Sequence, residues 1–117
     1  MTTKQVANRL VELCRQGKIQ EAQNELYAEN IVCVEPEHAP LKSAKGFKAV
    51  VEKGKAFASM IEERHGGSIS DPVVAGKFFS IEMTLDATMK GTGRTLLEEI
   101  CVYEVKDGKI VYEQFFF

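Results

Sequence analysis

The chain has 117 residues and a formal net charge of −2, from 15 basic and 17 acidic residues. That length predicts a single domain over residues 1–117, because two independent cores rarely fit below about 150 residues. The near-neutral charge does not indicate the basic surface that nucleic-acid binding needs. No stretch of apolar residues approaches the roughly 18 residues of a membrane span. We therefore expect neither a nucleic-acid nor a membrane partner.

Three cysteines at wide spacings, with no CxxC pair, suggest neither a zinc site nor a redox motif. The N-terminal residues show no apolar run after Lys4, so no signal peptide is expected there. Together these features predict a cytoplasmic protein with reduced, buried thiols.

The first two helices are predicted from local signals. Thr2 and Gln5 have the spacing of a capping box, and Gly17 is a helix stop. A second short helix is expected from about residue 18 to residue 28. The β-branched segment 31–35 then predicts a strand.

A third helix is predicted after a loop bracketed by Pro36 and Pro40. Ser43 is its candidate cap, and Gly66 with Gly67 is its expected end. The helix has the clearest apolar periodicity of the chain, at Phe47, Val50, Val51, Gly54, Phe57, Ala58 and Ile61.

The second half of the chain predicts four strands. Segment 69–75 carries a proline and is expected at a sheet edge or a bulge, and segment 77–89 alternates apolar with polar residues. Segments 95–105 and 110–117 flank Asp107-Gly108, a hairpin signal. The order predicts an α+β fold with three helices packed on one face of a strongly curved, mainly antiparallel sheet.

Several segments carry a resemblance to the nuclear transport factor 2-like superfamily, especially its SnoaL-like branch. They are Leu26-Tyr27-Ala28-Glu29-Asn30-Ile31-Val32 leading to Glu35-Pro36, Lys45-Gly46-Phe47, Phe79-Ser80-Ile81-Glu82-Met83 and Tyr103-Glu104-Val105-Lys106-Asp107-Gly108-Lys109-Ile110. Ketosteroid isomerases, polyketide cyclases and scytalone dehydratase share this fold. The resemblance implies a cone with an internal pocket, and function must be argued from the site itself.

The resemblance also implies that the outer sheet face pairs with a second subunit, so a homodimer is expected. The last two strands are apolar on both faces, which fits a covered outer face, although burial within a monomer would give the same pattern. We expect Ile100, Val102, Phe115 and Phe117 on one face, and Cys101, Tyr103, Val105 and Phe116 on the other.

Glu35 is the most informative candidate for chemistry, because it stands directly before Pro36 at a strand end. In ketosteroid isomerases an aspartate before a proline moves the proton at this place, so the resemblance implies a base for abstraction α to a carbonyl. A salt-bridged or solvated glutamate is the alternative. The isomerases' tyrosine and protonated aspartate donors fall on Leu10 and Cys101, neither of which is a strong donor.

Glu99 and Tyr103 are candidate assistants, since both share the face of Cys101 in a strand. A regular two-residue turn would place Glu113 on the opposite face, and a bulge would place it with Glu99. A buried acid could donate a hydrogen bond when protonated, or it could be neutralised by Arg94, Lys77 or a dimer mate.

Two histidines complete the candidates. His38 could shuttle a proton at the pocket mouth, or it could be an ordinary surface residue of its loop. His65 is expected to cap the end of the third helix. Their spacing with Glu35 matches no metal motif, so no metal is expected.

An apolar pocket wall is predicted from residues that would otherwise be ordinary core: Phe57, Met60, Ile61, Phe79, Ile81, Met83 and Cys101, with Glu113 as a further contact. Two hypotheses follow. One is a cofactor-free enzyme that acts on a small hydrophobic carbonyl compound by proton transfer, isomerisation, cyclisation or hydration. The other is a non-catalytic dimeric module that binds an apolar ligand or partner in the same cone.

Overall fold

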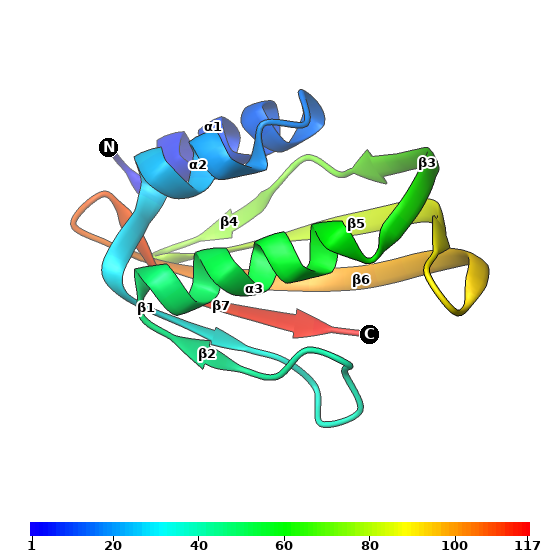
Figure 1. Cartoon of the computed structure of the whole chain (residues 1–117). Helices are drawn as coiled ribbons and strands as arrows, with labels where there is room; N and C mark the ends of the chain where they lie inside the picture. Colours follow the sequence, from blue (N-terminus) through cyan, green and yellow to red (C-terminus); the bar gives the residue numbers. More distant parts are fainter.

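A computed structural model describes residues 1–117 as three helices on one face of a curved seven-stranded sheet (Figure 1). This confirms the predicted α+β class. The elements are α1 (Thr3–Arg15), α2 (Ile19–Leu26), β1 (Tyr27–Val34), β2 (Ala44–Lys45), α3 (Phe47–Ser59), β3 (Ile61–Ile69), β4 (Val73–Ala75), β5 (Phe78–Met89), β6 (Gly93–Lys106) and β7 (Lys109–Phe116). No helix is long and apolar enough to cross a membrane.

Helix α1 begins and ends where the sequence signals predict. The Gln5 backbone N–H donates to Thr2 Oγ1 at 3.2 Å, and the Thr2 N–H donates to Gln5 Oε1 at 2.9 Å, which completes the capping box. Gly17, at φ 73°, turns the chain out of the helix. The apolar face of α1 packs against the inner face of the sheet, where its residues form part of the hydrophobic core.

Helix α3 differs from the prediction at both ends. Its cap is Gly46, and Ser43 instead accepts a hydrogen bond from the Glu35 backbone N–H at 2.9 Å. Gly66 and Gly67 lie within β3 and do not end the helix. Position 67 requires a glycine for a steric reason, because a Cβ there would lie 2.7 Å from the carbonyl oxygen of Thr84 on β5.

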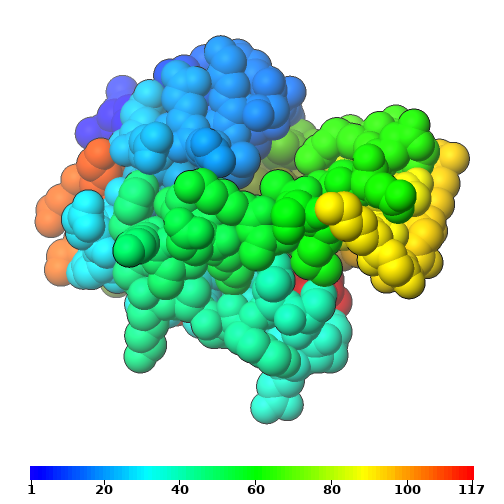
Figure 2. Space-filling model, viewed as in Figure 1, coloured from blue at the N-terminus to red at the C-terminus, as the bar shows by residue number.

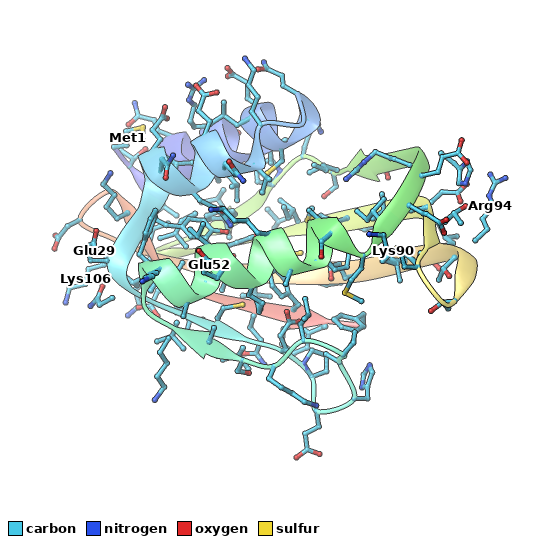
Figure 3. All side chains as sticks on the ribbon, in the orientation of Figure 1. Met1, Glu29, Glu52, Lys90, Arg94 and Lys106 are labelled. Atoms are coloured by element: carbon cyan, nitrogen blue, oxygen red, sulfur yellow. The ribbon has the colours of Figure 1, made fainter.

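The strand order is β2-β1-β7-β6-β5-β3, with β4 also paired to β5. Strands β1 and β7 run parallel, and the other pairs are antiparallel. Strands β5 and β6 form a long hairpin whose turn, marked by Lys90 and Arg94, lies at the opposite end of the molecule from Met1 and Lys106 (Figure 3). Figure 2 shows α3 across the front of the molecule, with α1 and α2 above it and the β5–β6 end projecting to one side.

The hairpin of β6 and β7 contains a bulge that sets which side chains face inward. Asp107 and Gly108 have φ values of 52° and 75°, as a two-residue turn requires. The register then shifts, so that Val105 pairs with Ile110 but Glu104 pairs with Tyr112. One extra residue on β7 reverses the alternation beyond this point.

The bulge determines on which face of the sheet Glu113 lies, a question that the sequence left open. Tyr103 pairs with Glu113 and therefore shares the inner face with it. Cys101 pairs with Phe115, and Ile100 pairs with Phe116. The predicted faces of Phe115 and Phe116 are therefore wrong, because the extra residue exchanges them.

Candidate functional site

Glu35 lies just beyond β1, and the alternation of that strand turns its side chain inward, as it does for buried Cys33. Its Oε2 is 2.5 Å from the Nζ of Lys53 on α3. The same Nζ lies 2.7 Å from Cys33 Sγ. Only 10% of the Glu35 side chain and 12% of the Lys53 side chain are exposed, so the ion pair is largely shielded from water.

The surroundings of Lys53 favour its charged form. Burial by itself lowers the pKa of an amine, but the contacts with Cys33 and Glu35 outweigh burial here and the net shift of the Lys53 pKa is upward. Burial, with the nearby Glu113 carboxyl, raises the pKa of Cys33 to about 12. Lys53 is therefore an ammonium group that lies beside the neutral thiol of Cys33.

Glu113 is the most deeply buried acid of the site, at 3% exposure. The Tyr27 hydroxyl donates a hydrogen bond to its Oε2 at 2.5 Å. Burial raises the pKa of the Glu113 carboxyl, and the hydrogen bond from Tyr27 only partly opposes that shift. No basic side chain makes an ion pair with it.

Glu99 lies on the inner face of β6, directly opposite Met83 on β5. Its Oε1 accepts one long hydrogen bond, from Cys101 Sγ at 3.5 Å. Burial raises the pKa of this carboxyl, and the Glu35 and Glu113 carboxyls raise it further. Glu99 is thus a half-buried acid whose pKa is raised mainly by its burial.

Neither basic residue that the sequence suggested as a partner for Glu99 reaches it. Arg94 makes a bidentate contact with Asp86, with Nη2 2.9 Å from Oδ2. Lys77 lies 3.3 Å from Glu104. Both acids are on the outer face, opposite to that of Glu99, so the two predicted pairings are wrong for a single chain.

The predicted pocket residues divide into two groups. Phe79, Ile81, Cys101 and Tyr103 are part of the closed core, where the Tyr103 ring stacks on Phe79 with centroids 4.7 Å apart. The residues that are only half-buried are Phe57, Met60, Ile61 and Met83. The second group keeps part of its apolar surface exposed to solvent.

The histidines lie in separate places. The ring of His38 meets the edge of Phe117 at a centroid distance of 5.3 Å, in the loop that follows Glu35. His65 is on β3, where its Nε2 lies 2.7 Å from Thr88 Oγ1. The predicted helix-capping role of His65 is therefore wrong, because α3 ends before it.

Two surface hollows lie apart from these residues. One lies between α1 and the Asp71-Pro72 turn, and the other surrounds the beginning of α3 at Gly46. No group of three or more His, Cys, Asp or Glu side chains is placed to hold a metal ion.

Lys53, Cys33 and Tyr27 are site residues that the sequence reasoning missed. A signal for Lys53 was present, because it follows Val50 by three residues and precedes Phe57 by four on the apolar face of α3. A charged residue within an apolar helical stripe needs an internal partner. Tyr27 gave no comparable signal.

Comparison with known proteins identifies the family. A model of the SnoaL-like domain matches residues 1–117. A proposed SnoaL-like polyketide cyclase from Mesorhizobium loti is 33% identical, each chain covers 100% of the other, and the TM-score is 0.93. The chain therefore belongs to the SnoaL-like family of the nuclear transport factor 2-like superfamily, as the sequence resemblance predicts.

More distant structures share the fold alone. A nuclear transport factor 2-like protein of unknown function from Burkholderia pseudomallei has a TM-score of 0.80 at 15% identity, over 100% of this chain and 92% of that one. IdmH, a proposed polyketide cyclase from Streptomyces antibioticus, has a TM-score of 0.72 at 18% identity, over 99% of this chain and 91% of that one. Among curated proteins, none matches this chain.

Proposed function

We propose that this protein binds a small apolar carbonyl compound on the inner face of its sheet and moves a proton on it without a cofactor. Glu35 is the base. The observation that carries the proposal is the inward carboxylate of Glu35, held beside Lys53 at the end of β1. A general base must lie within hydrogen-bond reach of the proton it removes, and the half-buried Phe57, Met60, Ile61 and Met83 would supply apolar contacts to the ligand.

Glu99 is the assisting acid in this proposal. Burial raises the pKa of the Glu99 carboxyl, and a protonated carboxyl can donate a hydrogen bond to a ligand oxygen. His38 is the assistant at the mouth, and Tyr103 supports the site from the core. The Mesorhizobium loti relative is described both as a proposed polyketide cyclase and as a carbohydrate phosphatase, and the first description supports chemistry on a carbonyl compound.

The test uses 1-tetralone, an apolar ketone with enolisable hydrogens, in deuterium oxide. We expect the wild-type protein to accelerate exchange of the α-hydrogens, followed by proton NMR. Glu35→Gln should reduce the accelerated rate about 100-fold or more, the usual size of a general-base contribution. Glu37→Gln is the matched control, because Glu37 is exposed in the same loop, and it should leave the rate unchanged. Equal rates in the wild type and Glu35→Gln would contradict the proposal.

The second candidate is a binding module without catalysis. The specific observation in its favour is that Glu35 and Lys53 already neutralise each other in the free protein, as a purely structural ion pair does. This candidate predicts that 1-tetralone binds to the wild type without any accelerated exchange.

We also propose that two copies pair through the outer face of the sheet. Ile100 and Phe116 are direct neighbours on that face and are 44% and 49% exposed. Phe78, Leu96 and Val73 are also exposed there, as their pairings on β5 place them with the outer residues. Exposed large apolar side chains on one face of a sheet are typical of a protein interface.

A further inference from the structure

We infer that Lys53 is a catalytic residue that stabilises the oxygen of the bound carbonyl compound as negative charge develops on it. The inference rests on the proposed function, which supplies a base but leaves the charge on oxygen to be stabilised. The two positions that carry the donors in the isomerase-like site are Leu10, which has no donor, and Cys101, whose thiol bonds to Glu99.

The Lys53 ammonium has more hydrogen-bond donors than it has protein acceptors. An ammonium group has three N–H donors and no acceptor. Two of those on Lys53 are directed at Cys33 Sγ and Glu35 Oε2. The third has no protein acceptor among the hydrogen bonds of the structure, so one charged donor is free to meet a ligand oxygen.

The Lys53 ammonium lies beside an aromatic ring and is largely shielded from water. Nζ lies 5.2 Å from the centroid of the Phe115 ring, whose face stabilises a cation without supplying an acceptor. The Lys53 side chain is 12% exposed, so little water competes with a ligand for its third donor. A preorganised charge in such surroundings stabilises an oxyanion more than the same charge does in water. The upward shift of the Lys53 pKa agrees with a permanent cation at neutral pH.

The proposed base, Glu35, and the proposed donor, Lys53, lie next to each other. The oxygen and the α-hydrogen of a carbonyl compound are close neighbours, so the base and the oxyanion donor must also be neighbours. Glu35 Oε2 and Lys53 Nζ are 2.5 Å apart. In the step, the α C–H bond breaks, its proton forms an O–H bond with the Glu35 carboxylate, its electron pair forms the C=C bond of the enolate, and the π electron pair of the carbonyl moves onto the oxygen. Lys53 then pairs with the enolate in place of the carboxylate it has lost.

The test uses 4-nitrophenol, whose phenolate resembles an enolate in charge and is detected by its absorbance. We expect the wild type to bind the phenolate at least tenfold more tightly than Lys53→Met does, because an adjacent cation shifts such an equilibrium by at least about one pKa unit. Lys53→Arg should retain most of the preference. Lys55→Met is the matched control, because Lys55 is exposed on the same helix, and it should behave as the wild type.

The inference is overturned by phenolate binding that is equal in the wild type and Lys53→Met, by no binding to the wild type at millimolar concentration, or by loss of binding only in Lys55→Met. If Lys53→Met does not fold, the wild type still decides. Phenolate must then shift the Lys53 ¹³Cε resonance and leave that of Lys55 in place, and an unmoved Lys53 resonance refutes the inference. A Lys53-dependent phenolate site with exchange unaffected by Glu35→Gln would remove the proposed base and leave Lys53 as an oxyanion-binding residue.

Discussion

Three glutamates share the inner face of this molecule, and their neighbours give them different properties. Glu35 is paired with a lysine, Glu113 with a tyrosine hydroxyl, and Glu99 with a thiol alone. Burial raises the pKa of the Glu99 and Glu113 carboxyls, whereas Glu35 is held in an ion pair with Lys53. The three carboxyls therefore differ in the residue that each one touches.

The buried acid Glu113 makes the stability of the protein depend on pH. Its pKa is raised in the folded state, so between the unfolded value of about 4.3 and the folded value the folded state binds more protons. Its contribution to stability is therefore lost as the pH rises through that window. We expect Glu113→Gln, which still accepts from Tyr27, to flatten the decline in the free energy of unfolding as the pH rises above about 4.3, because a difference of one pKa unit between the two states corresponds to about 1.4 kcal/mol.

Urea unfolding at a series of pH values measures this effect. Glu98→Gln is the control, because Glu98 is exposed on the outer face of β6, and its slope should match that of the wild type. If Glu113→Gln declines as steeply as the wild type, the pKa of Glu113 is not raised in the folded state and the prediction is wrong.

At the scale of elements, the two glycines of β3 have unequal importance. A Cβ at position 67 would lie 2.7 Å from the backbone oxygen of Thr84, whereas a Cβ at position 66 would meet nothing within 4 Å. We expect Gly67→Ala to destabilise the protein by about 1–3 kcal/mol, the usual cost of overpacking. Gly66→Ala should change stability much less. Thermal unfolding of the two variants measures the difference, and equal melting temperatures would show that β5 can move away from β3.

The elements whose signals are local could be predicted from the sequence. The capping box of α1, the Asp107-Gly108 turn and the alternation of β5 all appear in the structure as expected. The end of α3 could not be predicted from the sequence. Gly67 is required because β5 passes close to β3 there, and this contact depends on the tertiary structure. The bulge in β7 is likewise set by packing, since the turn alone permits either register.

The candidate site could be predicted in part. The strand alternation placed Glu99 inward, and the proline after Glu35 marked that residue through a family resemblance. Lys53 was missed because the periodicity of α3 draws attention to its apolar positions. Its partners, Cys33 and Glu35, come from a strand that is distant in the sequence, so only the packing of α3 over β1 brings the three together.

At the scale of the whole molecule, the outer sheet face predicts a pair of chains. Placing a charge at its centre should prevent association, because the charge would be buried without a partner. We expect analytical ultracentrifugation to find the wild type as a dimer and Ile100→Glu as a folded monomer. Ile19→Glu is the control, because Ile19 is similarly exposed but lies on α2, and it should remain a dimer. A wild type that is monomeric at micromolar concentration would contradict the proposed assembly.

The proposed ligand site on the inner face of the sheet can be tested directly through the methionine residues. Met83 lies opposite Glu99 and Met60 is half-buried at the end of α3, whereas Met1 lies by the β6–β7 turn, with its backbone near Gly108. Methyl NMR of ¹³C-methionine-labelled protein titrated with 1-tetralone therefore locates the ligand. We expect the Met83 and Met60 resonances to shift in proportion to occupancy while that of Met1 stays in place. Unmoved Met83 and Met60 resonances, or a shift confined to Met1, would contradict a ligand site on the inner face.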